Sequence, residues 1–527
     1  MQPFELLFLA VVTAGIVRLL AGPIHPRVSY ATIGAVGLGM AGLGAVIEGL
    51  RWQMIPAYLG FGLLMLAQLK KSKTRTFWRR LGALPLFLLM SLSAFLVHQT
   101  PVLSLPAPSG PYGVGTFSYS LTDTSRKERY APERNRELFV EVWYPADKSG
   151  LDQVPVRTLF QELYEGKYTR QSFLFGYMRH IPTHSHVQAP IARGGKRFPV
   201  LLFNHALAPG FTSQNQLLME QLASHGYVVL SIAHPYQSSK VNLKQAGTIT
   251  AASGYPRDLT SVLTRPEMRE SVVGKIMAAN SDVKQVSALK AVISPLADQY
   301  LALPAAHRKA FLHRAVARSD LQPYRKFISE DLLEDYFIYD YAVENSMTQY
   351  WVEDMKFVAD RLGELHAPVA GFHDAIDVSG FGVFGMSYGG GAVGEFCKVD
   401  RRCRAGANLD GTYFGRHWDR PVPAPFLMLY NEEHQGGNDF AYLPPTHEFW
   451  EYTVKGASHF DFSDFTYAWP LFKTFGLAGS IDGMRMIDIT NGVVLNFFDY
   501  SLKGKPIGGE LFTDIPEIVV RHHTIVA

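Results

Sequence analysis

The residues whose types and spacing most clearly indicate chemistry lie in the segment 381–392, which reads Phe-Gly-Val-Phe-Gly-Met-Ser-Tyr-Gly-Gly-Gly-Ala. A short apolar run typical of a β-strand breaks there into a Gly-x-Ser-x-Gly motif formed by Gly385, Ser387 and Gly389. Between a strand and a helix this motif forms a nucleophile elbow, a strained turn that exposes the serine hydroxyl. A Cβ at either glycine would collide with the neighbouring strand or helix. We expect Ser387 to be a nucleophile, and an ordinary turn serine is the alternative.

A serine hydroxyl attacks a carbonyl when a base removes its proton, and the base needs an acid to fix its tautomer. With a nucleophile elbow, the acid and then the histidine follow the serine along the chain. The segment 404–411 reads as a strand ending in Asp410, where a parallel strand presents a side chain to the crevice. We expect Asp410 to be the acid, and an Asx turn at the strand end is the alternative. Its rivals follow the next strand: Glu432, Glu433 and Asp439.

The base is expected in the segment 455–462, Lys-Gly-Ala-Ser-His-Phe-Asp-Phe, which follows the last predicted strand of the series. His459 fits the chain order, and we expect it to be the base. His434 and His447 are the alternatives, but both lie in a polar loop, where solvated histidines are common.

An oxyanion needs two backbone N–H donors, each contributing about 3 kcal/mol. One donor belongs to the residue after the nucleophile, Tyr388. The other is expected in the loop 204–210 after an early strand, where we assign Leu207. His205 in the same loop is interpreted as a hydrogen-bonded core histidine rather than a base.

No metal site and no cofactor are expected. His180, His184 and His186 are spaced like a metal cluster, but they lie in a predicted loop without an acidic neighbour and are interpreted as surface histidines. Cys397 and Cys403 lack the Cys-x-x-Cys spacing of metal sites. A disulfide, if this part of the chain faces an oxidising compartment, and two buried free thiols are the alternatives for them.

Strands and helices alternate after residue 112, which predicts a mostly parallel α/β sheet flanked by helices. Between them, residues 237–347 are charged and read as a helical insertion, for example over 301–316 and 331–341. A solvated structural cap and a lid that gates the pocket are both open interpretations. The predicted strands cover residues 113–120, 137–144, 197–204, 227–233, 405–409, 425–430 and 451–454, and the predicted helices 216–225, 351–364 and 487–502.

The first hundred residues hold apolar runs near the roughly 20 residues that cross a bilayer. A cleaved signal peptide would explain only the first run. We predict a transmembrane domain of about four helices at 1–100, a proline-rich linker at 101–111 and an α/β domain at 112–527. The runs cover residues 3–20, 28–47, 52–69 and 81–97.

Basic residues predict the orientation of this domain. The loop 70–80 carries lysines and arginines but no acidic residue, and Arg18 and Arg27 flank the first loop, so both loops are expected in the cytoplasm. Everything after Thr100 is then extracytoplasmic, in a multi-pass membrane protein whose helices have the lipid bilayer as partner. The formal net charge of +3 gives no reason to expect a nucleic-acid partner.

Several segments carry a family resemblance: 110–115, 138–145, 198–205, 222–229 and the elbow. From residue 110 onward the chain resembles the platelet-activating-factor acetylhydrolase family of the plasma, lipoprotein-associated phospholipase A2 type, in the α/β-hydrolase superfamily. Segments 403–410 and 458–465 match the family segments that carry the triad acid and base, which implies these roles for Asp410 and His459. The resemblance implies a calcium-independent serine esterase that cleaves short or oxidised acyl chains from lipids.

Two departures from the family pattern limit how far the family's substrate can be assigned to this chain. The family has His-Gly-x-Gly at the oxyanion loop, whereas residues 205–208 read His-Ala-Leu-Ala, and alanine restricts that turn. The apolar N-terminal runs and the insertion are foreign to the secreted enzyme. Related bacterial hydrolases with the same motifs act on other esters, so a small or polymeric ester remains open beside a lipid ester.

These patterns predict a membrane-anchored serine ester hydrolase with the triad Ser387, Asp410 and His459. The alternative is a catalytically weak, membrane-bound binding or assembly protein on a hydrolase scaffold, since fold alone does not guarantee activity. The complete triad favours the enzyme. The sequence leaves the natural ester, the acyl length and the oligomeric state open.

Overall fold

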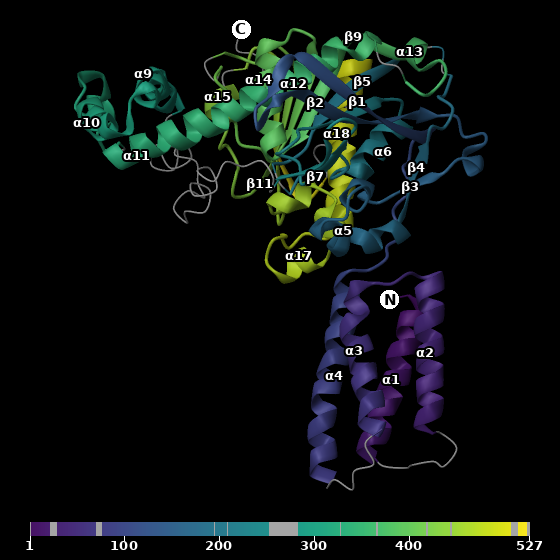
Figure 1. The fold of residues 1–527 in the computed structure, drawn as a ribbon. Helices are drawn as coiled ribbons and strands as arrows, with labels where there is room; N and C mark the ends of the chain where they lie inside the picture. The colour runs from purple at the N-terminus through teal and green to yellow at the C-terminus, as the bar shows by residue number, and fades with distance from the viewer. Residues whose placement is uncertain are drawn as a thin grey trace. The chain divides into compact units, whose positions relative to one another are not determined.

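The structure of the chain, a computed structural model, divides into two compact units (Figure 1). Unit 1 contains Met1–Pro106, Thr158–Thr183 and Phe465–Leu477, and unit 2 contains Ala107–Arg157, His184–Asp464 and Ala478–Ala527. The predicted division at 1–100, 101–111 and 112–527 stays a prediction. The structure describes residues 2–21, 29–69, 76–193, 195, 197–207, 209–251, 283–326, 328–364, 367–417, 420–442, 445–506 and 515–523.

Four apolar helices of unit 1 pack against one another (Figure 1). Val12 and Leu64 are buried between the helices, whereas Leu38, Val46 and Phe87 are exposed. Apolar side chains both inside and outside a helix bundle are typical of helices surrounded by lipid. The helices are α1 (Pro3–Ala21), α2 (Tyr30–Ile47), α3 (Ile55–Leu69) and α4 (Thr76–Gln99).

Among the described residues, three stretches are long and apolar enough to cross a membrane: Pro3–Leu20, Tyr30–Ile47 and Gly82–Gln99. A further apolar stretch, Trp52–Leu66, is shorter. Arg27 and residues 70–75, on which the predicted orientation depends, lie outside the described residues. A fourth span and the orientation therefore stay predictions.

A mostly parallel sheet forms the centre of unit 2, as predicted. Its strand order is β13-β12-β11-β10-β9-β5-β6-β2-β1-β4-β3. The six strands from β12 to β6 are parallel, while β13 and β2 are antiparallel to their neighbours in this set. The strands are β1 (Gly113–Glu128), β2 (Ala131–Ala146), β3 (Val156–Thr158), β4 (Pro182–Val187), β5 (Phe198–Asn204), β6 (Val228–Ala233), β9 (Ile376–Met386), β10 (Cys403–Leu409), β11 (Phe426–Asn431), β12 (Phe449–Val454) and β13 (Ile518–His523).

Helices cover both faces of this sheet (Figure 1). Because successive side chains of a strand point to opposite faces, Leu202 and Val383 enter one buried cluster while Leu201 and Phe384 enter the other. Burial on both faces explains why these strands read as continuous apolar runs. The first cluster includes side chains of α12 (Ser346–Asp360) and α14 (Tyr388–Val399), and the second those of α6 (Gln216–Ser224) and α18 (Gly483–Lys503).

The insertion at 237–347 is helical only in part. Its first segment forms an antiparallel hairpin, because Val241 and Ile249 bury one face and Gly247 adopts a φ of 73° at the turn. The helix predicted over 301–316 is interrupted before Ala305, where Pro304 is the N-cap of the second helix with an extended ψ of 144°. Residues 252–282 lie outside the described part. The elements are β7 (Lys240–Leu243), β8 (Gly247–Thr250), α9 (Val283–Ala302), α10 (Ala305–Val316), α11 (Glu330–Asp335) and the π-helix η8 (Tyr336–Asn345).

The prediction that His180, His184 and His186 lie in a loop is wrong. His184 and His186 lie on strand β4, which pairs in parallel with β1, and His180 ends the 3-10 helix η4 (Gly176–His180). The remaining elements are short: α5 (Arg170–Phe175), α13 (Phe372–Ala375), α15 (Asp439–Tyr442), α16 (Phe465–Ala468), α17 (Leu471–Thr474) and the 3-10 turns Trp52–Met54, Leu151–Gln153, Gln161–Leu163, Ser319–Tyr324, Leu362–Glu364 and His459–Phe462.

Candidate active site

Ser387 lies at the sharp turn between β9 and α14. Its φ of 57° and ψ of −129° are outside the regions that non-glycine residues favour, a strain of about 1–3 kcal/mol. The Ser387 backbone N–H donates to Leu409 O at 2.8 Å, and its carbonyl accepts from Gly391 N–H at 3.2 Å. These bonds to β10 and α14 hold the serine in its strained conformation.

Both glycines of the motif lie against backbone atoms. A Cβ on Gly385 would lie 2.5 Å from the carbonyl carbon of Gly389, and a Cβ on Gly389 would lie 2.3 Å from Asn204 O. Backbone atoms cannot move aside as a flexible side chain can, so the turn requires glycine at both positions.

Replacing Gly389 by alanine is therefore expected to lower the free energy of unfolding by about 3 kcal/mol, because the added carbon overlaps β5 backbone. The thermal unfolding midpoint of the full chain measures this loss. Gly363→Ala is the matched control, because a Cβ there meets none of the atoms that the structure describes within 4 Å. Equal midpoints for the two variants would show that the turn does not need this glycine.

The structure brings the predicted nucleophile, acid and base into one hydrogen-bonded chain. His459 Nε2 lies 2.8 Å from Ser387 Oγ, and His459 Nδ1 lies 2.6 Å from Asp410 Oδ2. Because an ionised carboxylate only accepts, Nδ1 donates to Asp410, which leaves Nε2 to accept the serine proton. This is the geometry by which a histidine activates a serine hydroxyl.

A capping box holds the short helix that carries His459. Ser458 N–H donates to Asp461 Oδ2 at 2.8 Å, and the same oxygen accepts from Gly479 N–H at 2.7 Å. Asp461 is buried, so its carboxylate fixes the backbone at the point where the His459 side chain leaves it.

Asp410 is buried at the end of β10, and four N–H groups reach its carboxylate. Oδ1 accepts from Asn431 N–H at 2.9 Å, while Oδ2 accepts from Asn431 Nδ2 at 3.1 Å and from both His459 and His434. Burial alone would raise the pKa of Asp410, but the hydrogen bonds from His434 and His459 outweigh it, so this pKa lies below its usual value. The carboxylate is therefore ionised and acts as an acceptor at neutral pH.

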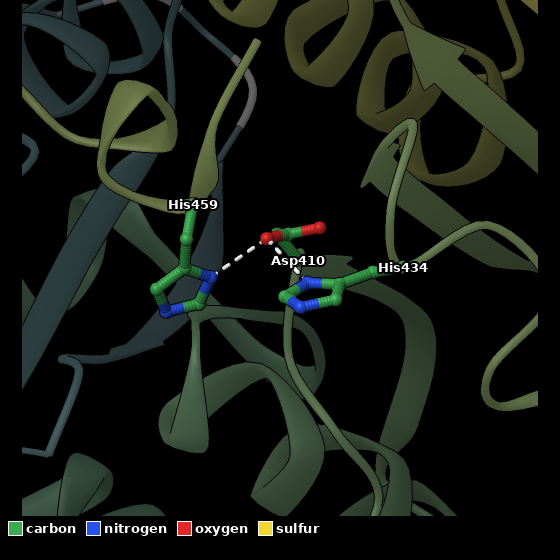
Figure 2. A group of neighbouring side chains, drawn as sticks. All are labelled: Asp410, His434 and His459. Atoms are coloured by element: carbon green, nitrogen blue, oxygen red, sulfur yellow. Dashed lines mark hydrogen bonds and ion pairs between the residues drawn. The ribbon is translucent and has the colours of Figure 1, made fainter. Parts of the chain in front are cut away.

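A second histidine thus shares the oxygen that His459 uses. His434 Nδ1 lies 2.9 Å from Asp410 Oδ2, and Figure 2 shows the two imidazoles converging on the carboxylate from different loops. The hydrogen bond to Asp410 raises the pKa of His434. Ser387 Oγ hydrogen-bonds to His459, so the two histidines are not equivalent.

The other sequence candidates lie elsewhere. Glu432 and Glu433 are exposed, and Glu432 accepts from the backbone N–H of Gly456. His447 is exposed beside Thr446. The side chain of Asp439 lies outside the described residues.

The two predicted oxyanion donors belong to the elbow and to the loop after β5. Tyr388 is the first residue of α14 and directly follows Ser387. Leu207 follows β5, and its side chain packs against the buried cluster that contains Trp351 and Tyr388. The hydroxyl of Tyr388 lies 2.7 Å from Thr348 Oγ1, which ties the start of α14 to α12.

The side chain of His205, within the predicted oxyanion loop, is buried. Its Nε2 accepts from His234 N–H at 3.1 Å and from Ser238 Oγ at 2.7 Å. Nδ1 therefore carries the proton and donates to Ala206 O at 2.6 Å. The C=O and N–H of a trans peptide point in opposite directions, so this bond also fixes the direction of the Leu207 N–H.

Burial, reinforced by the nearby His234, lowers the pKa of His205 from 6.5 to about 3. Between these values the unfolded chain binds a proton that the folded chain excludes. Stability is therefore expected to fall as the pH falls through this window, by up to about 1.4 kcal/mol per pH unit. Urea unfolding of the wild-type chain and of His205→Asn, which does not titrate, measures the two slopes. Equal slopes would contradict a neutral, buried His205.

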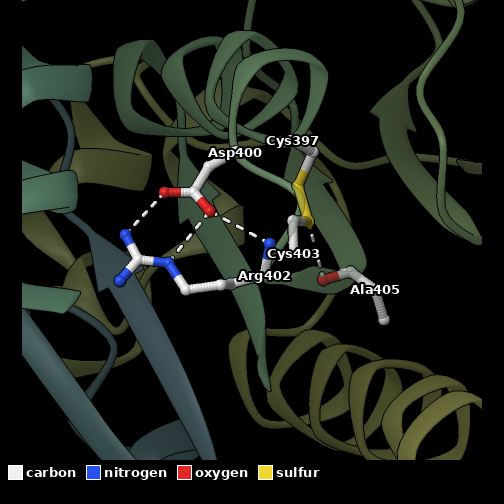
Figure 3. Close-up of a disulfide and its surroundings, with 5 residues drawn as sticks. All are labelled: Cys397, Asp400, Arg402, Cys403 and Ala405. Atoms are coloured by element: carbon white, nitrogen blue, oxygen red, sulfur yellow. Dashed lines mark hydrogen bonds and ion pairs between the residues drawn. A yellow bond between two sulfur atoms is a disulfide. The ribbon is translucent and has the colours of Figure 1, made fainter. Parts of the chain in front are cut away.

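A disulfide joins Cys397, near the end of α14, to Cys403, at the start of β10 (Figure 3). Between them Asp400 accepts from Arg402 Nη2 at 2.7 Å and from Arg402 Nε at 3.0 Å. Both interactions brace the connection between the helix that follows Ser387 and the strand that ends at Asp410.

Sequence reasoning missed two contacts that shape the site. Asn431 binds both oxygens of Asp410, and His434 was considered only as a rival base. No local pattern indicated these contacts, which depend on the strand order: β11 lies beside β10, and Leu409 pairs with Leu429. The residues that follow the two strands must then be neighbours.

The chain matches a sequence profile described as platelet-activating factor acetylhydrolase, isoform II, over residues 98–253 and 356–505. The platelet-activating factor acetylhydrolase of Cavia porcellus is 22% identical over 424 residues, which cover 77% of this chain and 79% of the relative. The Bos taurus protein of the same name is 24% identical over 408 residues, covering 74% and 77%.

Among solved structures, a ferulic acid esterase from Streptomyces cinnamoneus is similar with a TM-score of 0.54 and 19% sequence identity. The similarity covers 80% of this chain and 99% of the esterase. At this level of identity it shows the fold: a mostly parallel sheet flanked by helices.

Proposed function

The chain belongs to the platelet-activating factor acetylhydrolase, isoform II family, and we propose that it is a membrane-anchored serine ester hydrolase. The observation that carries the proposal is the hydrogen-bonded chain from Ser387 Oγ through His459 to Asp410, with Ser387 on a strained elbow. Family and fold support an ester hydrolase in general, and the residues of this site supply the mechanism.

In the proposed reaction, Ser387 Oγ attacks the acyl carbonyl carbon while His459 Nε2 takes the hydroxyl proton. Asp410 holds the imidazole in the required tautomer and stabilises its cationic form. When the tetrahedral intermediate collapses, His459 gives the proton to the departing alkoxide, and an acyl-serine remains. Water that loses its proton to His459 then attacks the acyl carbon, and the carboxylic acid leaves as Ser387 regains its proton.

The tetrahedral oxyanion would be held by the backbone N–H groups of Tyr388 and Leu207. The bond from His205 to Ala206 O supports this role for Leu207, because it orients the peptide unit to which the donor belongs. Preorganised donors of this kind contribute about 3 kcal/mol each to the lowering of the barrier.

The proposed substrates are carboxylic esters with a short acyl chain or a lipid-like body. The names of the relatives support an acetyl ester of a phospholipid-like alcohol. An ester outside the phospholipids is the other candidate, since alanines replace the glycines of the family motif in segment 205–208.

We propose further that the apolar helices of unit 1 anchor the chain in a membrane with the catalytic residues outside the cytoplasm. Three stretches long enough to span support the anchor. The Cys397–Cys403 disulfide supports an oxidising compartment for the catalytic part. A reporter that is active only in the cytoplasm, fused after residue 110, should be inactive. An active fusion would show that the chain has the opposite orientation.

The insertion is proposed to be a structural cap. Leu289 and Ile293 of α9 belong to the same buried cluster as Val352 of α12 and Phe396 of α14. Side chains that share a core with the sheet support a fixed cover more than a gating lid.

A fluorophosphonate probe tests the enzymatic proposal on the detergent-solubilised full chain. The probe phosphonylates a serine that is activated by a neighbouring base, so we expect one label on the peptide that contains Ser387, found by mass spectrometry. Heat-denatured chain should remain unlabelled. A folded chain without label would overturn the enzyme and favour a binding protein on the same scaffold.

A further inference from the structure

The cluster at Asp410 contains more than a triad requires. His459 Nδ1 and His434 Nδ1 both donate to one oxygen, Asp410 Oδ2, at 2.6 and 2.9 Å. Asp410, His434 and His459 each offer one ligand atom, and these atoms lie within 4.8 Å of one another. Two imidazoles and a carboxylate on converging loops are the donor set of a transition-metal site (Figure 2).

We propose that Asp410, His434 and His459 bind one Zn²⁺ ion, and that this ion reversibly switches off the hydrolase. The regulatory part rests on the proposed function, whereas the binding part does not. The ion would take Asp410 Oδ2 and the Nδ1 atoms of both histidines as ligands, and water would complete the tetrahedron.

The distances between Asp410 Oδ2 and the two Nδ1 atoms suit a metal ion that takes the place of the two Nδ1 protons. Tetrahedral zinc with bonds of about 2.0–2.1 Å separates its ligand atoms by about 3.3 Å. The present Nδ1–Oδ2 separations of 2.6 and 2.9 Å must therefore widen by less than 1 Å. The side chain of His434 is 44% exposed and follows the end of β11, so it can make this adjustment and admit an ion from solvent.

A supporting shell is already present around the carboxylate. Asn431 N–H binds Oδ1 at 2.9 Å and Asn431 Nδ2 binds Oδ2 at 3.1 Å, and these two bonds orient the carboxylate whose Oδ2 would bind the metal. Outer hydrogen bonds of this kind fix metal ligands in place. Imidazole nitrogen with one carboxylate oxygen favours Zn²⁺ over Ca²⁺ or Mg²⁺, which prefer all-oxygen sites.

Occupation would remove the catalytic base by changing its tautomer. A metal on His459 Nδ1 displaces the proton that is now donated to Asp410, and the neutral ring then carries its proton on Nε2. That nitrogen can no longer accept the proton of Ser387 Oγ, 2.8 Å away. The proton moves within the imidazole through solvent, so inhibition needs no change of redox state and no new covalent bond.

The test uses the full chain in detergent and a buffer that does not bind metal. Added Zn²⁺ is expected to lower p-nitrophenyl acetate turnover at least about tenfold, and EDTA should restore it. Calorimetric titration with Zn²⁺ should give one ion per chain. His434→Gln removes one of three ligands, so its half-inhibitory concentration, measured against its own metal-free rate, should rise at least about tenfold.

His447→Gln is the matched control, since His447 is an exposed histidine outside the cluster. It should keep the wild-type zinc response. Equal inhibition of the wild-type chain and His434→Gln, or calorimetry without a site, would overturn the proposal. A chain that binds one Zn²⁺ through His434 but hydrolyses no ester would instead remove the proposed function and its regulation, and leave the metal site standing. Circular dichroism melts exclude misfolding of His434→Gln.

Discussion

Replacing Ser387 by alanine is expected to lower kcat for p-nitrophenyl acetate about 10⁶-fold, to the residual rate that binding and the oxyanion donors sustain. The reason is that, among the residues the structure describes, Ser387 supplies the hydroxyl that hydrogen-bonds to His459 Nε2. The fold should persist, because alanine fits the turn that the backbone bonds to Leu409 O and from Gly391 N–H maintain. Initial rates with the purified full chain measure the loss.

Ser379→Ala is the control for this experiment, because Ser379 lies on the same strand but is exposed and lies outside the Gly-x-Ser-x-Gly motif. Its rate should stay within about twofold of the wild-type rate. Turnover retained in Ser387→Ala would exclude the serine mechanism, whatever the family of the chain.

Local sequence was sufficient for the elbow. The turn depends on two glycines, because a Cβ added at either one would meet backbone atoms. The five-residue Gly-x-Ser-x-Gly motif shows this requirement directly. The β-strand before Ser387 and the helix after it were predicted for the same reason, since an apolar run ending in small residues leaves few alternatives. The mostly parallel sheet followed from alternating strands and helices and is confirmed.

The surroundings of Asp410 depended on strand neighbours. Asn431 and His434 reach this carboxylate because β11 lies beside β10, and no local pattern states which strands pair. The same limit applies to β4, where His184 and His186 lie on a strand because β1 offers a partner. Pairing between distant segments is decided by tertiary packing rather than by local preference.

In the insertion, by contrast, a local signal was present in the sequence but was not used. Residues 240–250 carry a strand signal, with Val241 and Ile249 on one buried face and Gly247 at the turn, yet the surrounding charge favoured helix. The alternation of buried and exposed positions covers only a few residues, and the charged composition of the longer segment 237–347 led to the prediction of helix instead. Pro304 was likewise a local signal for the break between α9 and α10.

Replacing Asp410 by asparagine is expected to lower kcat about 10⁴-fold, an effect of the size seen when a triad acid becomes an amide in other serine hydrolases. Both oxygens of Asp410 accept hydrogen bonds from N–H donors. In either orientation, the NH₂ of an asparagine would therefore face another donor. The backbone N–H of Asn431 cannot become an acceptor, whereas a histidine can change tautomer. The amide should therefore turn its NH₂ toward the histidines, and His459 would then carry its proton on Nε2, where it cannot accept one from Ser387.

Glu432→Gln supplies the comparison, because Glu432 is a rival acid that lies in the next loop but contacts Gly456 N–H instead of a histidine. Its kcat should stay within about twofold of the wild-type value. Zinc adds an independent readout, since Asp410→Asn also loses the charged ligand, so the residual activity of this variant should no longer respond to the ion. If Asp410→Asn kept most of its activity while Glu432→Gln lost it, the acid would lie in the loop after β11, and the buried carboxylate of Asp410 would be structural.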